Sequence, residues 1–110
     1  MLTEIDEISQ IRWLAKPKVA IPDIVAAVAH KSGIATVQLL GERRQKHIAK
    51  QRFMLYWLCR ELTGHSYPLL GRMLNRDHTT LLHGIKRFEE MRQSDMKLKQ
   101  ISDELLRELA

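Results

Sequence analysis

Four hydrogen-bonding side chains at positions 77–80 form the part of the sequence best suited to molecular recognition. Asp77, His78, Thr79 and Thr80 supply a carboxylate, an imidazole and two hydroxyls where a segment with helical spacing begins. A carboxylate accepts a hydrogen bond from the cytosine amino group, and hydroxyls can bond to any base edge. Asp77 is also a favourable N-cap residue, so it has a structural role beside the recognition role. The run predicts a helix tip that carries hydrogen-bonding groups of the kind that base edges accept.

The segment that follows has the apolar spacing of an amphipathic helix. At about 100° per residue, Leu81, Ile85, Phe88 and Met91 share one face. The opposite arc carries donors, acceptors and cations: Thr79, Thr80, His83, Lys86 and Arg87. Periodicity alone fits an ordinary solvated face equally well. Because threonine is a modest helix former but a good hydrogen-bonding group, its presence here favours a binding face.

Cations are concentrated in the middle of the chain. The net charge is +5. Residues 42–87 hold ten basic and three acidic side chains, whereas residues 1–41 hold four of each. Residues 88–110 hold four basic and six acidic side chains. A basic segment that ends with the candidate recognition helix is the expected footprint of a nucleic-acid-binding face.

Length and composition limit the class of protein. With 110 residues, 45% hydrophobic and 28% charged, the chain predicts one small globular domain with a modest core. No apolar run is long enough to span a membrane. The acidic N-terminus lacks the basic start and apolar stretch of a signal peptide. We therefore expect a cytoplasmic protein with no membrane partner.

Catalytic and cofactor chemistry is poorly supported. The single cysteine, Cys59, lies in an apolar stretch and is interpreted as a buried, inert thiol. His78 and His83 are separated by about 140° around a helix, so they cannot share a metal ion. None of the five glycines belongs to a Gly-x4-Gly-Lys-Ser/Thr pattern, so no nucleotide site is expected. The sequence predicts neither an enzyme nor a bound cofactor or metal.

Helical patterning runs through the whole chain, and alternating strand patterns are absent, so the fold class is predicted to be all-α. Thr3 could cap a first helix with Ile5, Ile8, Ile11 and Leu14 inward. Residues 53–59 are apolar on every side, which predicts a buried central helix that ends at Thr63-Gly64. Before it we expect a helix with Pro22 in its first turn that ends at Ser32-Gly33, and a short turn at 37–40 capped by Thr36. After it we expect a helix capped by Ser66, with Pro68 in its first turn, that runs to Leu74, and then the helix after Asp77. A last helix begins at Ser94-Asp95, with these residues inward: Leu98, Ile101, Leu105 and Leu109.

These motifs resemble the DNA-binding domain of the bacterial chromosomal replication initiator DnaA. The match rests on residues 76–80, RDHTT, and on residues 61–71, ELTGHSYPLLG, where the family often reads ELTNHSLPEIG. The resemblance runs from near Ile21 to about Met91. It implies a small helical bundle of Trp-repressor-like arrangement with a helix-turn-helix. We expect residues 1–20 to form a helix and linker, residues 21–93 the domain, and residues 94–110 a helix packed on it.

The resemblance assigns roles to individual residues. Base reading in the major groove is carried over to Asp77, His78, Thr79 and Thr80, with His83, Tyr67 and Pro68 beside them. A minor-groove arginine corresponds to Arg43 or Arg44, and the spacing does not decide which. The expected phosphate contacts are Lys46, Lys50, Arg52, Arg60, Arg76, Lys86 and Arg87.

Three departures from the family pattern bear on function. Asn75-Arg76 replaces Gly-Gly-Arg, which shortens the turn by one residue and predicts a changed docking angle. Lys50-Gln51-Arg52-Phe53 replaces Arg-Pro-Arg-Gln, which removes a rigid start and a polar contact. The missing nucleotide-binding pattern means that origin melting and ATP-driven filament formation cannot be carried over.

The sequence thus predicts specific binding of double-stranded DNA at a DnaA-box-like site, related to TTATNCACA. The expected role is control of replication initiation or transcription, by a phage, prophage or bacterial paralogue of the initiator. An excised domain of a full initiator is less favoured, because residues 1–20 begin with Met and have their own helical pattern. A third interpretation is a protein-interaction module that uses the polar helix face, so a protein partner is left open.

Overall fold

The computed structural model describes residues 19–42 and 44–110 of the chain. Every regular element within those ranges is a helix, which confirms the predicted all-α fold class. The helices are α2 (Ile21–Ser32), α3 (Thr36–Leu39), α4 (Lys46–Thr63), α5 (Tyr67–Leu74), α6 (His78–Ser94) and α7 (Met96–Leu109). The helix expected from Thr3 and the residue Arg43 lie outside the described residues.

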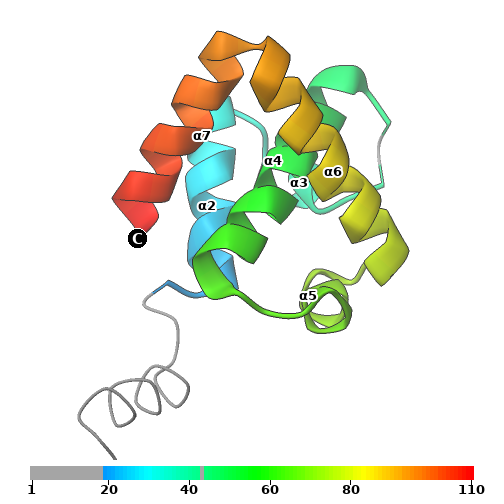
Figure 1. Ribbon diagram of the computed structural model, residues 1–110. Coiled ribbons are helices and arrows are strands. Elements are labelled where there is room, and N and C mark those ends of the chain that lie inside the picture. The colour runs from blue at the N-terminus through cyan, green and yellow to red at the C-terminus, as the bar shows by residue number, and fades with distance from the viewer. Residues whose placement is uncertain (1–18, 43) are drawn as a thin grey trace, which may run out of the picture.

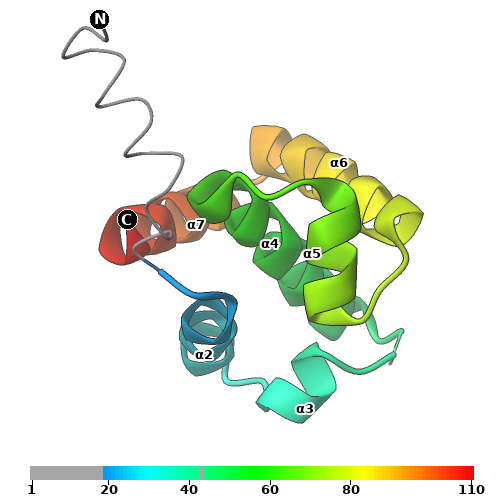
Figure 2. The same cartoon turned by 90° about the horizontal axis from the view of Figure 1, so that it is seen from below.

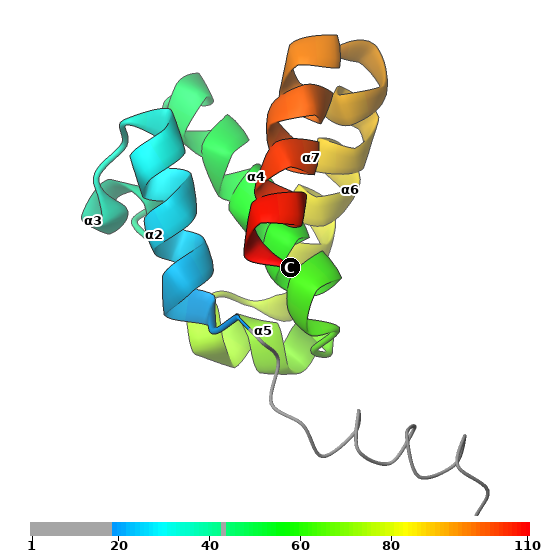
Figure 3. The same ribbon diagram turned by 90° about the vertical axis from the view of Figure 1, so that its left-hand side faces the viewer.

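Helix α4 is the centre of the bundle. It lies between α2 and α3 on one side and the α6–α7 pair on the other, and α5 crosses one end (Figure 3). Met54, Leu55, Leu58 and Cys59 have no exposed surface, as the apolar stretch predicts. The helix begins earlier than that stretch, at Lys46. Its polar first turns are held to the core by Ile48, which is 2% exposed.

The helix ends follow local backbone rules. Gly33 and Gly64 end α2 and α4 with φ angles of 72° and 66°, in the left-handed region that glycine adopts without strain. The Ser66 hydroxyl accepts a hydrogen bond from the Leu69 N–H at 3.3 Å, which confirms the predicted cap of α5. The predicted cap at Thr36 is wrong by one residue. Ala35 is the capping position, because its carbonyl oxygen already accepts from the N–H of Leu39 in α3.

Helices α6 and α7 are joined by a sharp bend, from which they diverge (Figure 1), and a side-chain cap closes the bend. The Asp95 carboxylate accepts from the Leu98 N–H at 3.0 Å and from Lys50 Nζ at 3.2 Å. These bonds hold the Asp95 pKa below its ordinary value, and the bond from the Leu98 backbone has the larger effect. The Arg92 guanidinium, in α6, lies 4.3 Å from the ring centre of Trp57 in α4.

Among the described residues, no helix is both long and apolar enough to cross a membrane.

Candidate DNA-binding surface

Helices α5 and α6 form a helix-turn-helix at one edge of the bundle (Figures 1 and 2). Asn75 lies in the turn with a φ of 54°, which this residue tolerates better than most others. The Arg76 N–H donates to the Gly71 carbonyl oxygen at 2.7 Å. The turn of Asn75 and Arg76, one residue shorter than the family pattern, therefore closes through a left-handed asparagine and a backbone hydrogen bond.

Gly71 makes this close approach possible. A Cβ atom at this position would lie 2.5 Å from the Arg76 carbonyl oxygen, and that oxygen belongs to the backbone of the turn. We expect Gly71→Ala to lower the free energy of unfolding by about 2 kcal/mol, because the turn must move away from α5. Chemical denaturation measures the change. Gly33→Ser is the comparison. Gly33 has a φ of 72° and no atom within 4 Å of an added Cβ, so this substitution measures backbone strain without crowding.

The predicted recognition residues are brought together on the exposed face of α6. Asp77, His78, Thr79, Thr80 and His83 are all exposed. The opposite face is buried and comprises Leu81, Ile85 and Phe88, at 0%, 3% and 0% exposure. The tip is therefore free to meet a ligand while the core holds the helix in place.

Asp77 lies at the centre of the tip. Although it is the N-cap residue, its side chain makes no capping hydrogen bond. Its Oδ1 atom is 3.6 Å from Nδ1 of His78, and 67% of the side chain is exposed. The carboxylate is therefore available as an acceptor from outside the protein.

Two shallow hollows flank the tip and share Asp77. One, of about 500 Å³, is lined by Thr79, Thr80, His83 and Arg87, with Phe53 and Gly84 also in its wall. The other, of about 450 Å³, is lined by His78 with Pro68, Gly71, Arg72, Asn75 and Arg76. The base-reading candidates from both sides of the turn, apart from Tyr67, therefore line two hollows that meet at Asp77.

Several cations near this surface are exposed to solvent. They are Arg44, Lys46, Arg72, Lys86 and Arg87. Arg72 was not among the phosphate contacts expected from the sequence, although it lies in the basic segment one turn before Asn75. Lys50 is an expected contact that is half-exposed and paired with Asp95.

Arg52 corrects one expectation. It is 7% exposed, and its Nε and Nη2 atoms donate to the carbonyl oxygens of Leu39 at 2.8 Å and Gln38 at 3.0 Å. Burial lowers its pKa below the ordinary arginine value. These bonds satisfy carbonyls at the end of α3 that have no intrahelical donor. Arg52 is therefore a structural residue, and we withdraw it from the phosphate contacts.

Arg60 and Arg76 also face protein groups. The Arg60 guanidinium lies 4.5 Å from the ring centre of Tyr67 and donates to the His65 carbonyl oxygen. That contact leaves Tyr67 half-buried, whereas Pro68 beside it is exposed. The Arg76 guanidinium donates to backbone carbonyls of the loop after α3 and of its own turn. Both arginines hold elements of the surface in place.

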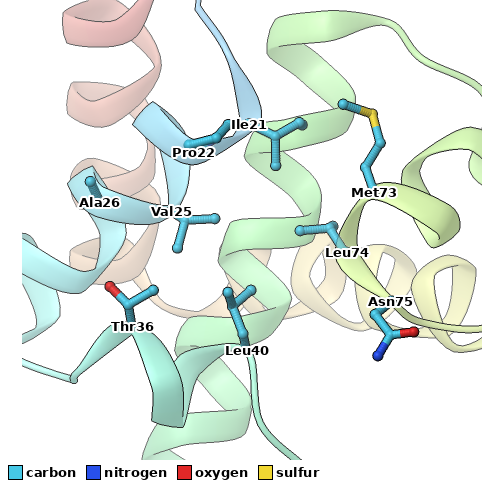
Figure 4. A pocket seen from close by; sticks show the side chains of 9 residues that line it. All are labelled: Ile21, Pro22, Val25, Ala26, Thr36, Leu40, Met73, Leu74 and Asn75. Atoms are coloured by element: carbon cyan, nitrogen blue, oxygen red, sulfur yellow. The ribbon is translucent and has the colours of Figure 1, made fainter.

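An apolar hollow lies elsewhere on the molecule, between α2, α3 and α5. It measures about 420 Å³, and its lining includes Ile21, Val25, Leu40 and Met73 (Figure 4). None of the described residues that line it is a cation, so it does not suit a phosphate backbone and is not part of the candidate surface.

Groups for other chemistry are sparse in residues 19–42 and 44–110. Burial raises the pKa of the Cys59 thiol to about 12, so this residue is the inert thiol that the sequence predicts. Within these ranges, no three His, Cys, Asp or Glu side chains are grouped so that they could hold a metal ion.

Comparison with known proteins identifies the family. A family model described as the bacterial dnaA protein helix-turn-helix matches residues 21–88. The chromosomal replication initiator protein DnaA of Caulobacter sp. (strain K31) is 40% identical over 93 residues, which are 84% of this chain and 19% of that protein. The same-named proteins of Jannaschia sp. (strain CCS1) and Ruegeria pomeroyi are 34% and 30% identical over 84% and 94% of this chain. The chain spans about a fifth of the length of these relatives. It belongs to the bacterial DnaA helix-turn-helix family, as the sequence resemblance predicts.

Proposed function

We propose that this protein binds double-stranded DNA with sequence specificity at a DnaA-box-like site. The observation that carries the proposal is the exposed tip of α6. It presents a carboxylate, two hydroxyls and two imidazoles beside exposed cations. This combination provides donors and acceptors for base edges and positive charge for phosphates in one surface. Family membership supports DNA binding by this element.

The proposed docking uses two elements of the surface. Helix α6 enters the major groove by its tip, so that Asp77, His78, Thr79 and Thr80 reach base edges, with His83 further along. The loop between α3 and α4 carries Arg43 and Arg44 toward the adjacent minor groove. A narrow A·T-rich groove has an enhanced negative potential that attracts such a side chain.

The proposed biological action is occupancy of sites that the replication initiator also recognises. The protein would then act in control of replication initiation or of transcription. The sequence has no Gly-x4-Gly-Lys-Ser/Thr pattern for nucleotide binding, so the proposal is limited to binding and competition.

Salt dependence tests the proposal. If about five exposed cations meet phosphates, log K should fall against log salt with a slope of about −4 to −5. Fluorescence anisotropy with labelled duplex DNA at several salt concentrations measures the slope. Selection from random duplexes then identifies the site.

A slope near zero, or no binding, would contradict the proposal. It would favour the alternative interpretation, in which the polar face of α6 binds a protein. A protein interface need not release counterions, so its affinity need not depend steeply on salt.

A further inference from the structure

The Arg76 guanidinium joins segments that are distant in the sequence. Its Nη2 atom donates to the carbonyl oxygen of Leu40 at 2.6 Å and to that of Gly41. Its Nη1 atom donates to the carbonyl oxygen of Asn75 at 3.0 Å. Its backbone N–H is bonded to Gly71 in α5. Arg76 therefore connects the turn before the recognition helix to the start of the basic loop, which we define as residues 41–45.

Backbone carbonyl groups after α3 accept hydrogen bonds from the Arg76 guanidinium and so stabilise its charge at this place. The end of a short helix leaves acceptors without intrahelical donors. Arg52 donates to the carbonyl oxygens of Gln38 and Leu39, and Arg76 donates to those of the next two residues. Burial is the main cause of the lowered Arg52 pKa, and nearby Tyr56 opposes it. The positive charge of Arg76 is close enough to lower the Arg52 pKa further. Their repulsion is offset by four carbonyl dipoles.

We propose that Arg76 is a positioning residue that fixes the basic loop beside the tip of α6. The inference rests on the proposed function, because the separation of loop and tip matters only when both contact one duplex. Arg44 is exposed and follows the anchored Gly41 by three residues. The anchor therefore limits where Arg44 can reach. Arg76 thus affects DNA specificity indirectly, by holding the loop in position, since its guanidinium is hydrogen-bonded to protein carbonyls.

The geometry of the bridge requires arginine. Two separate nitrogens of the planar guanidinium donate to carbonyls on opposite sides of the gap between loop and turn. Lysine has a single ammonium group on a flexible stem and cannot reproduce this fork. Arg76→Lys therefore keeps the charge that attracts DNA but loses the two-nitrogen fork and so weakens the bridge.

Hydrogen exchange in the free protein tests the bridge without DNA. The Gly41 N–H donates to the Gln38 carbonyl oxygen at 3.2 Å. In Arg76→Lys its exchange rate should rise about tenfold, because the anchored end of the loop opens more often. The Leu55 amide, in the core of α4, should exchange as in the parent. Arg72→Lys makes the same change at an exposed neighbour and should leave both rates unaltered. An unchanged Gly41 rate in Arg76→Lys would overturn the proposal.

Binding measurements test the effect on specificity. Arg76→Lys should reduce discrimination between A·T and G·C pairs at the loop end of the site about tenfold, with little change on random duplex. In a chain with Arg43→Ala and Arg44→Ala, the same substitution should have almost no further effect. Equal effects in both backgrounds would show that Arg76 contacts DNA itself, which overturns the positioning role. If the parent binds no duplex, the proposed function fails, and the exchange rates still decide the bridge.

Discussion

His78→Ala combined with Thr80→Ala is expected to weaken binding to the specific duplex by about 2 to 4 kcal/mol, a factor of about 30 to 1,000. Each side chain would lose hydrogen bonds to base edges, and each such contact distinguishes the right base from a wrong one. Affinity for random duplex should remain close to that of the parent, since both substitutions leave the exposed lysines and arginines in place. Competition binding with specific and random duplexes measures the two effects.

Stability provides the control for this prediction. Both side chains are exposed and neither contributes to the core, so the unfolding midpoint should stay close to that of the parent. Gln93→Ala, at an exposed position near the other end of α6, is the matched substitution and should leave specificity intact. Equal losses on specific and random duplexes would mean that His78 and Thr80 do not read bases.

The fold could be predicted from sequence because its main signals are local. Apolar periodicity identified the buried faces of α6 and α7, and the stretch at 53–59 identified the central helix. Gly33, Gly64 and Ser66 marked helix ends through backbone conformation and capping, which depend on few neighbours. The error at Thr36 is of the same local kind, since neighbouring residues compete for one capping position.

The candidate site could be predicted where its residues form one contiguous motif. It could not be predicted where contacts between distant segments determine whether a side chain is exposed. The exposed tip of α6 follows from residues 77–83 and their spacing. The roles of Arg52 and Arg76 do not, because their carbonyl partners in and after α3 lie 13 to 36 positions away in the chain. A sequence shows that an arginine is basic, but not whether solvent or a buried acceptor faces it. The exposure of Arg72 could not be predicted for the same reason, as it depends on how α5 packs.

Arg52→Ala is expected to lower the free energy of unfolding by about 3 kcal/mol. The substitution removes two charge-assisted hydrogen bonds, one to the carbonyl oxygen of buried Leu39 and one to that of Gln38, which keeps the Gly41 N–H as a donor. Hydrogen bonds to charged groups contribute about 1.5 to 3 kcal/mol each, and the side chain's packing is lost as well. Urea unfolding should show a lower midpoint with an unchanged slope.

A surface arginine offers the matched comparison for Arg52. Arg87 has a side chain that is 62% exposed and pairs with Glu90 one turn away, so Arg87→Ala should change stability by less than about 0.5 kcal/mol. The two substitutions should also differ in binding. Arg87→Ala removes a proposed phosphate contact and should reduce the salt slope by about one, whereas Arg52→Ala should leave the slope of the folded protein nearly unchanged. If Arg52→Ala reduced the salt slope and left the unfolding midpoint unaltered, Arg52 would be a phosphate contact after all, and its hydrogen bonds from α4 to α3 would not contribute to the fold.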